Sequence, residues 1–373
     1  MVLLVNLARV MFAPLLDEFI GVFGVGEATA GLLVTLVWVG SALPRVPTGW
    51  LLTRVPRHRV VLATGVVLTA ASLFTATAES VVVLGAGALC MGLASGAYFV
   101  AANPLISELY PERVGRAMGI HGTASQVAAV VAAPFVALAV VYDWRLAFVA
   151  VGVAGAVVTV ALTLTARGAD LPAAGSADRD LLAAARAQWR VVLTGIVILG
   201  LTGFVWQGLF NFYELYMRAK GLSPSAAGTA ITVVFAAGVP AFFLSGRLAD
   251  RFPLVPYILG VVGSFAACLL ALTYVEGVAA VLVVTAAVGY VIHSLFPAMD
   301  TYLLDTLPDH HRGSAYSVYS FGMMVLQSTG SSAVGALAES GVAYDALFFV
   351  FALGLVAVVV VLGGLYRLGR LPS

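Results

Sequence analysis

The sequence predicts an all-α membrane protein, with twelve transmembrane helices in two pseudo-symmetric six-helix bundles and both termini in the cytoplasm. Three observations lead to this prediction. The 373-residue chain is 61% hydrophobic and 10% charged, with a mean hydropathy of +1.04, which is far from the composition of soluble domains. It contains about twelve apolar stretches of roughly the 20 residues that a helix needs to cross a bilayer. One sequence pattern also occurs in it twice.

The repeat has a single ungapped offset of 197 residues. The matched pairs are Gly31 and Gly228, Gly49 and Gly246, Leu51 and Leu248, Arg54 and Arg251, Gly92 and Gly289, Phe99 and Phe296, and Pro111 and Pro308. Asp17 falls on Glu214. Parallel duplication of a multi-helix membrane unit places a cavity at the interface between the halves, where many transporters bind their substrate. The repeat therefore favours a transport function.

The spans follow one another with short connections in each half. We predict helices at 2–23, 28–52, 59–78, 80–107, 116–141, 144–166, 190–217, 224–249, 254–274, 277–305, 313–339 and 344–367. The one long polar interval, 167–189, contains Pro172 and three aspartates. It divides the chain into an N-terminal bundle at 1–166, a cytoplasmic linker at 167–189 and a C-terminal bundle at 190–373.

The basic residues determine the predicted orientation, because Lys and Arg near helix ends resist translocation. With both termini inside, fourteen of the nineteen basic residues face the cytoplasm, and only Arg145, Arg218 and Lys220 lie in outer loops. We expect an integral protein of the plasma membrane of a prokaryotic cell, monomeric and surrounded by the lipid bilayer. Its net charge of +1 offers no basis for a nucleic-acid partner.

Motifs for enzymatic chemistry are missing from the sequence. It has no Walker-type Gly-rich loop with Lys, no metal-ligand constellation and no nucleophile arrangement, and its five histidines are scattered. We therefore expect neither an enzyme nor a bound cofactor or metal, and ATP is not the predicted energy source.

The loops after the second span of each half carry a recognisable signature. Residues 246–251 read Gly-Arg-Leu-Ala-Asp-Arg, and residues 49–59 keep the Gly, the Leu and a basic end while Thr53 replaces the acidic residue. Residues 108–113 read Glu-Leu-Tyr-Pro-Glu-Arg. With twelve spans and a repeat, this pattern resembles the major facilitator superfamily over the whole chain.

The resemblance implies that loop charges latch the two halves shut on the cytoplasmic side. In the C-terminal half the implied gate residues are Asp250, Arg251 and Asp305. Their N-terminal counterparts are Arg54, Arg57, Arg59 and Glu108. Simple topology signalling is an alternative role for these arginines.

Ionisable residues inside the spans are expensive in lipid, so they mark candidate functional positions. His293 is near the middle of its span, and Pro297 and Asp300 share its helix face. A histidine that titrates near neutral pH beside a carboxylate is suited to carrying a coupling proton. The alternative is a neutral histidine bonded to a neighbouring helix. Asp17 and Glu214 are further candidates for proton coupling, or else solvated residues at the rim.

Arg45 lies within the second span between Pro44 and Val46. A guanidinium there can bind a carboxylate or another anion bidentately. The stretch locally resembles the corresponding helix of nitrate/nitrite porters. A structural role, such as pairing with Glu108 or a helix end, is the alternative. Arg9 is close to the chain start, and we expect it to snorkel to the cytoplasmic surface.

A set of polar and aromatic residues near mid-depth completes the predicted site. The candidate substrate-binding residues are Arg45, Gln126, Trp206, Gln207, Asn211, His293, Tyr319 and Gln327. Each alone is as well explained by helix packing. Ala129, Ala133 and Pro134 resemble a degraded form of an element of drug/proton antiporters, which favours efflux.

The sequence thus predicts a secondary active transporter that moves a small organic, anionic solute by alternating access, coupled to protons. Two alternatives stay open. One is a nitrate-type inorganic anion porter, and the other is a transporter-like sensor that binds a ligand without moving it.

Overall fold

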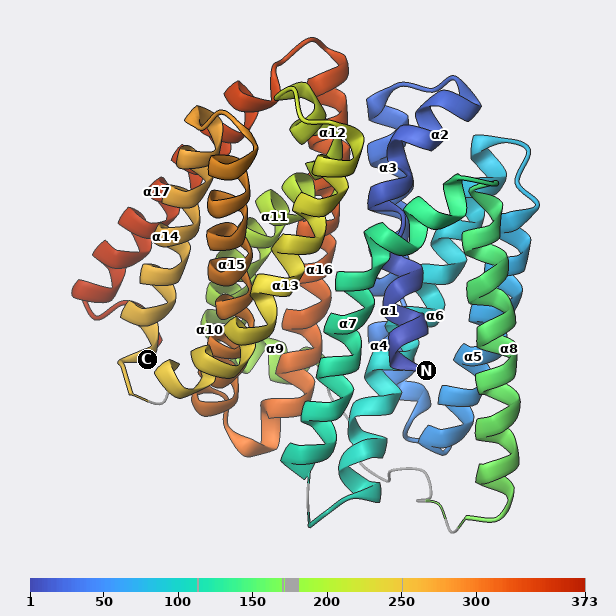
Figure 1. Cartoon of the computed structure of the whole chain (residues 1–373). Coiled ribbons are helices and arrows are strands. Elements are labelled where there is room, and N and C mark those ends of the chain that lie inside the picture. The colour runs from blue at the N-terminus through green and yellow to red at the C-terminus, as the bar shows by residue number, and fades with distance from the viewer. Residues whose placement is uncertain (113, 170, 172–180, 250, 373) are drawn as a thin grey trace. The chain divides into compact units, whose positions relative to one another are not determined.

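Every element in the described part of the chain is a helix (Figure 1). The structure is a computed structural model that describes residues 1–112, 114–169, 171, 181–249 and 251–372. The chain divides into two compact units. Unit 1 comprises Met1–Val25 and Leu32–Arg179, and unit 2 comprises Gly26–Gly31 and Asp180–Ser373.

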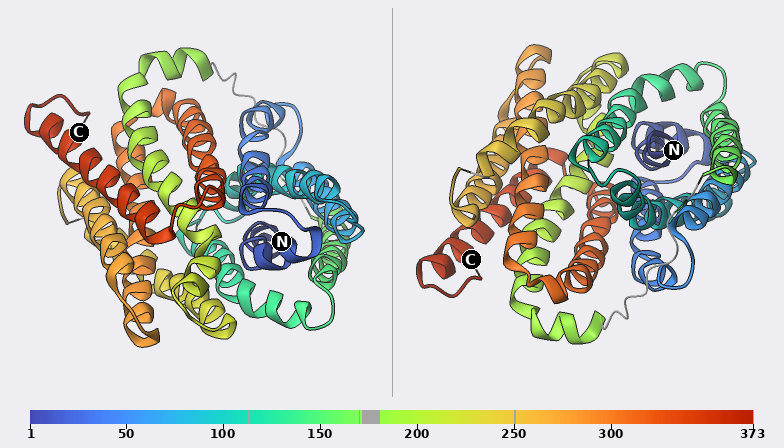
Figure 2. Two further views of the ribbon diagram at one scale, coloured as in Figure 1. Left: turned by 90° about the horizontal axis from the view of Figure 1, so that it is seen from above. Right: turned by 90° about the horizontal axis from the view of Figure 1, so that it is seen from below.

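Unit 1 contains the helices of the first half of the repeat. They are α1 (Val2–Val10), the short 3₁₀ helix η1 (Ala13–Leu15), α2 (Leu16–Phe23), α3 (Glu27–Ala42), α4 (Arg45–Leu51), α5 (Arg57–Ala76), α6 (Val81–Leu109), α7 (Val114–Val140) and α8 (Arg145–Arg167). Helix α1 contacts α6, α7 and α8 and lies in the middle of this unit (Figure 2). Seven of its nine residues are buried, so it has no broad face toward lipid.

Two predicted spans of unit 1 are interrupted where proline removes a backbone donor. The first span, 2–23, is divided into α1, η1 and α2, and Pro14 lies in η1. The second is interrupted at Pro44, directly before Arg45 begins α4. The structure therefore places Arg45 in the first turn of a new short helix.

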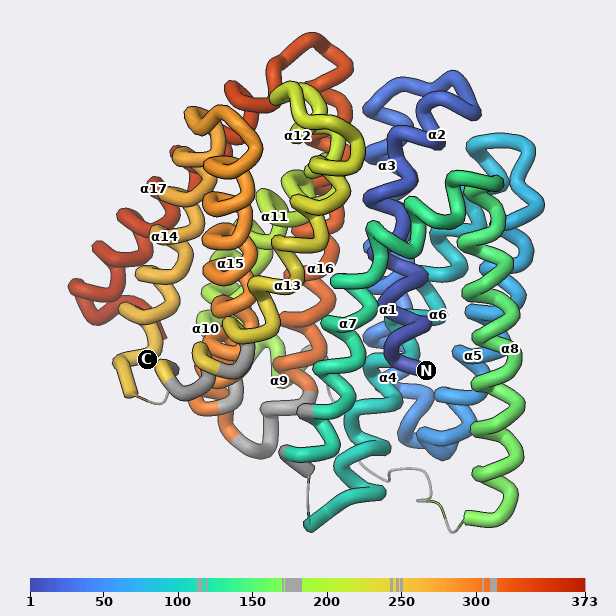
Figure 3. The backbone as a smooth tube through the Cα atoms, in the orientation of Figure 1, coloured from blue at the N-terminus to red at the C-terminus, as the bar shows by residue number. Residues whose placement is uncertain are grey.

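Unit 2 contains the first turn of α3 and all helices after α8. The latter are α9 (Leu181–Ala187), α10 (Trp189–Gly195), the π-helical segment η2 (Ile196–Gly200), α11 (Leu201–Asn211), α12 (Tyr213–Ala219), α13 (Pro224–Ala249), α14 (Leu254–Tyr274), α15 (Val278–Thr306), α16 (Asp309–Glu339) and α17 (Tyr344–Arg367). Figure 3 follows the backbone through the successive segments α10, η2, α11 and α12. The short helix α9 lies inside the polar interval 167–189 and packs against α16.

The first turn of α3 is held within unit 2 by two side-chain hydrogen bonds. The backbone N–H of Ala28 donates to Oε2 of Glu339 at 2.8 Å, and the hydroxyl of Tyr344 donates to Oε2 of Glu27 at 2.7 Å. The duplicated pattern gives no hint of this arrangement.

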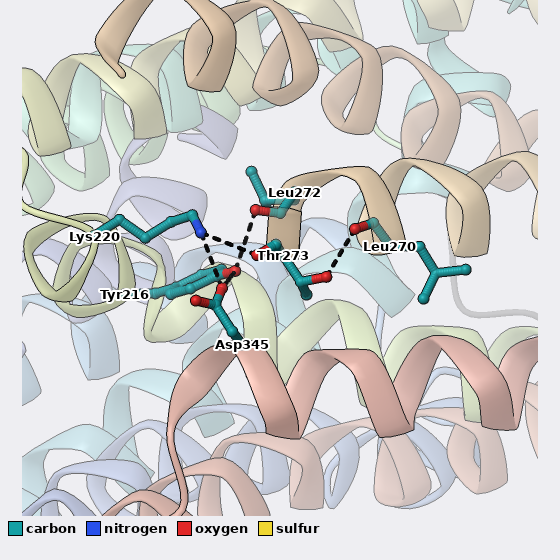
Figure 4. Close-up of polar contacts among 6 residues, drawn as sticks. All are labelled: Tyr216, Lys220, Leu270, Leu272, Thr273 and Asp345. Carbon is teal, nitrogen blue, oxygen red and sulfur yellow. Dashed lines mark hydrogen bonds and ion pairs between the residues drawn. The ribbon is translucent and has the colours of Figure 1, made fainter. Parts of the chain in front are cut away.

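One polar cluster ties α12, α14 and α17 together at an end of unit 2 (Figure 4). Nζ of Lys220 lies 3.0 Å from Oδ1 of Asp345 and donates to the carbonyl of Thr273 at 3.4 Å. The hydroxyl of Tyr216 donates to the same Asp345 oxygen at 2.5 Å. The only lysine of the sequence is therefore engaged in a structural contact.

Ten helices of the described residues are long and apolar enough to cross a membrane. The two predicted spans outside this group are 2–23, which is broken into short helices, and α16, which is long but rich in Ser and Gly. That these two segments also cross the membrane stays a prediction. The cytoplasmic location of both termini stays a prediction as well.

Candidate functional site

His293 lies at the centre of an aromatic cluster in unit 2. It is 3% exposed, on α15, and its Nδ1 donates to the carbonyl of Gly289 at 2.7 Å. The imidazole centroid lies 5.6 Å from the rings of both Trp206 and Phe235, which meet it edge-on, and 6.3 Å from the ring of Phe296. We define the His293 cluster as His293, Trp206, Phe235 and Phe296. Helices α11, α13 and α15 all contribute to it.

Two glycines explain why α13 and α15 approach so closely at this cluster. A Cβ atom on Gly238 of α13 would lie 2.6 Å from Cγ of His293, so only glycine leaves room for the imidazole. A Cβ atom on Gly289 would collide with the carbonyl oxygen of Val234. The small residues let the helices meet backbone to backbone, as is typical of membrane helix interfaces.

A second polar group lies along the contact of α11 with α16. Nδ2 of Asn211 donates to Oγ of Ser331 at 2.8 Å and to the carbonyl of Gln207 at 2.8 Å. All three residues are buried. Gln327 is also buried on α16, with its side chain directly against Gly203. The structure thus brings four predicted site residues, Trp206, Gln207, Asn211 and Gln327, onto α11 and the helix packed against it.

Tyr319 and Asp300 lie apart from the His293 cluster. The ring of Tyr319 packs on Gly195, at the junction of α10 with η2, and lies 5.6 Å from the ring of Tyr316. The hydroxyl of Tyr316 donates to Oδ1 of Asp300 at 2.8 Å, and the Asp300 side chain is exposed. Asp300 is two turns along α15 from His293, about 10 Å along the axis. The carboxylate is therefore in contact with a tyrosine, and no His293–Asp300 contact occurs among the described residues.

In unit 1, Arg45 and Gln126 are half-buried. Nε of Arg45 donates to the carbonyl of Ser41 at 3.3 Å. Glu108, the partner considered for Arg45, pairs with Arg57 at 2.8 Å.

The expectation that Arg9 snorkels to the surface is also wrong. Arg9 is 8% exposed and donates to Oδ1 of Asn6 at 2.5 Å and to Oγ of Ser41 at 3.3 Å. The cause is the burial of α1 on nearly all sides, so the guanidinium remains inside the unit.

The predicted gate residues are mostly at the surface. Arg54 is exposed and stacks on Trp50, with Cζ 4.0 Å from the ring centroid, and Arg59 is exposed as well. Arg251 and Asp305 are also exposed, and no ion pair joins them in the described part of the chain. Asp250 lies outside the described residues.

Asp17 and Glu214 occupy matching places in the two halves. Each is the second residue of a short helix that follows a break, α2 for Asp17 and α12 for Glu214. A carboxylate in the first turn is stabilised by the helix dipole. Asp17 is exposed and Glu214 is half-buried.

Sequence reasoning missed the pair of Tyr98 and His121. The Tyr98 hydroxyl lies 3.2 Å from Nε2 of His121, and the two rings are stacked with centroids 5.9 Å apart. Both residues line a cavity of about 650 Å³ in unit 1, together with Arg116 and apolar residues of α1, α6 and α7. The available signal was a histidine inside the span 116–141, the same criterion that identified His293.

These features define a polytopic helical membrane protein whose polar and aromatic groups are buried between the helices, the class to which solute transporters belong. The profile of the Major Facilitator Superfamily matches residues 1–254 and 195–372, so the chain belongs to this family of membrane transporters.

Sequence relatives match a smaller part of the chain. The purine ribonucleoside efflux pumps NepI of Salmonella paratyphi B and Salmonella enteritidis PT4 are each 31% identical to it over 153 residues. The match covers 40% of this chain and spans only 38% of the length of these relatives.

Solved structures show the same fold. A bacterial homologue of the human lysosomal transporter Spinster, in an inward-facing and unoccupied conformation, has a TM-score of 0.77 at 20% identity. The likeness covers 91% of this chain and 80% of that one. The occupied form of the homologue has a TM-score of 0.73 over the same shares.

Proposed function

We propose that the protein is a secondary active transporter that moves a small organic solute across the plasma membrane by alternating access, driven by protons. Two six-helix bundles, 1–166 and 190–373, form the moving parts, and both chain termini are cytoplasmic. The family, the duplicated pattern and the ten apolar helices support this proposal. As a monomer in the lipid bilayer, such a protein needs only its solute and protons as partners.

The observation that carries the proposal is the His293 cluster with the adjoining polar groups of α11 and α16. A buried imidazole surrounded by three aromatic rings is poorly explained by packing alone, since an apolar side chain would fill the space without a desolvation cost. Ionisable groups at membrane depth typically serve a ligand or a proton. Trp206 also stacks on Phe210, with centroids 5.7 Å apart, which extends the aromatic surface.

The proposed cargo carries a flat ring, because aromatic surfaces bind flat rings by stacking and edge contacts. The names of the sequence relatives indicate purine ribonucleosides as the first compounds to test and export as the first direction. Gln207, Asn211 and Gln327 supply amides that recognise ring or sugar hydroxyl groups. In unit 1, Arg45 and Gln126 are the residues that we propose for solute binding.

For proton coupling we propose His293 as the principal carrier, with Asp300, Asp17 and Glu214 as the carboxylates that complete the pathway. His293 is the ionisable group nearest to the proposed ring-binding surface, so its charge is the one that ring binding affects most directly. Asp300 is exposed on the same helix as His293 and is bonded to Tyr316.

Counterflow in proteoliposomes tests the transport function. Vesicles that contain the full chain are loaded with unlabelled inosine or guanosine, and uptake of the same labelled nucleoside is followed without any ion gradient. We expect a transient overshoot in the wild type and a much smaller one in Trp206→Ala. Binding of nucleoside without exchange would instead support a sensor and contradict the proposal.

A further inference from the structure

The interior of unit 1 contains a buried positive charge that the proposed cargo site does not use. Arg9 is in the last turn of α1, with 8% of its surface exposed. Its two hydrogen-bond acceptors, Oδ1 of Asn6 and Oγ of Ser41, are neutral. The guanidinium is therefore held in one place by fixed, uncharged neighbours.

Arg9 has no carboxylate partner in the described part of the chain. Within the described ranges no carboxylate lies within 4 Å of its guanidinium, and the charged side chain that acts on it is a second cation, Arg45. The two arginines meet at Ser41, whose hydroxyl accepts from Arg9 and whose carbonyl accepts from Arg45. A buried charge without a partner is strongly unfavourable, and a like charge beside it adds to the cost.

The same place also holds two donors that lack acceptors. Nε of Arg9 and Nε1 of Trp38 are both buried and make no hydrogen bond to any residue that the structure describes. Cζ of Arg9 lies 4.7 Å from the centroid of the Trp38 ring and 4.9 Å from that of Phe99. A guanidinium has five N–H groups, and neighbours occupy two of them, so three remain for a ligand.

We propose that Arg9 binds the carboxylate group of the transported organic solute, with the indole N–H of Trp38 as a second donor and Arg45 as a supporting charge. A planar carboxylate supplies the missing negative charge and accepts side by side from the guanidinium fork. The inference rests on the proposed transport function, and it extends the candidate cargo from neutral nucleosides to small organic acids. Nitrate is a planar oxyanion of similar geometry, so it is the discriminating inorganic probe.

Ligand-induced thermal stabilisation of the purified full chain in detergent tests the inference without any transport. The probes are benzoate and nicotinate, their neutral isosteres benzamide and nicotinamide, and nitrate. A compound that binds only the folded state raises the unfolding midpoint by mass action. We expect stabilisation by the two carboxylates and none by the two amides.

The variants are Arg9→Gln, which removes the charge, Arg9→Lys, which keeps it without the fork, and Arg167→Gln as a surface control. Arg167 is exposed at the end of α8, so its loss changes the net charge equally and leaves the interior intact. We expect carboxylate affinity to fall about thirtyfold in Arg9→Gln. Arg9→Lys should be intermediate and Arg167→Gln unchanged. Each shift is measured against the same variant without ligand, and Arg9→Lys remains informative if Arg9→Gln folds poorly.

Three outcomes would overturn the inference: equal stabilisation by carboxylates and amides, wild-type carboxylate binding in both Arg9 variants, or stabilisation by nitrate alone. None of these results affects nucleoside counterflow. Conversely, carboxylate binding that depends on Arg9 in a protein without exchange activity would refute transport and leave the oxyanion site standing.

Discussion

Adding one methyl group at Gly238 should disturb His293 without changing any charge. A Cβ atom there would lie 2.6 Å from Cγ, 2.7 Å from Nδ1 and 3.0 Å from Cδ2 of the imidazole, against an ordinary carbon contact of about 3.5–4.0 Å. The ring cannot retreat freely, because Nδ1 is bonded to Gly289 and the ring is packed against Trp206 and Phe235. Helices α13 and α15 must separate by about 1 Å, or the imidazole must leave its place.

The matched control is Gly228→Ala on the same helix, where a Cβ atom meets nothing within 4 Å. Alanine in place of a helical glycine stabilises by about 0.5–1 kcal/mol when space is free. Overpacking a filled interior costs about 1–3 kcal/mol. Both variants gain this helix term, so Gly238→Ala should be about 1–3 kcal/mol less stable than Gly228→Ala in denaturant unfolding in detergent, and its counterflow should be reduced. Equal stability of the two variants would refute the packing described around His293.

Two double-mutant cycles test other contacts of the structure. Arg57→Gln combined with Glu108→Gln should show a coupling of about 0.5–1 kcal/mol in the free energy of unfolding, as expected for a partly exposed ion pair. A coupling indistinguishable from zero would place the two side chains apart. Asn211→Ala combined with Ser331→Ala should show about 0.6 kcal/mol, the average for hydrogen bonds between membrane helices. Strictly additive effects would contradict the contact between α11 and α16.

The helices themselves were largely predictable from sequence. All twelve predicted spans lie on helices, with boundaries within four residues, because hydropathy reports the length of a segment that must bury apolar surface. Pro14 and Pro44 mark the breaks within the first two spans, because proline lacks the backbone N–H that a continuous helix needs. The π-helical turns at Ile196–Gly200 have no comparable marker in the sequence.

Side-chain partners were less predictable. Helical periodicity predicts that His293 and Asp300 share one face of a helix. Their contacts depend on the helices that pack against this face. His293 meets aromatic rings such as that of Trp206, whereas Asp300 accepts a hydrogen bond from Tyr316. Arg9 shows the limit most clearly. Its sequence position predicts that the guanidinium reaches water at the membrane surface. Helices α6, α7 and α8 pack around α1 and bury the side chain instead, and the sequence of α1 does not show this packing.

The most direct measurement of the central claim is solute flux in proteoliposomes under an imposed pH gradient, with a protonophore as control. For an exporter of a ring-bearing solute, we predict that a proton gradient drives flux against the solute gradient and that the protonophore abolishes this flux. The variant His293→Gln should retain solute exchange but lose the response to pH. Flux that is unaffected by the gradient in the wild type, or an unchanged pH response in His293→Gln, would contradict the account.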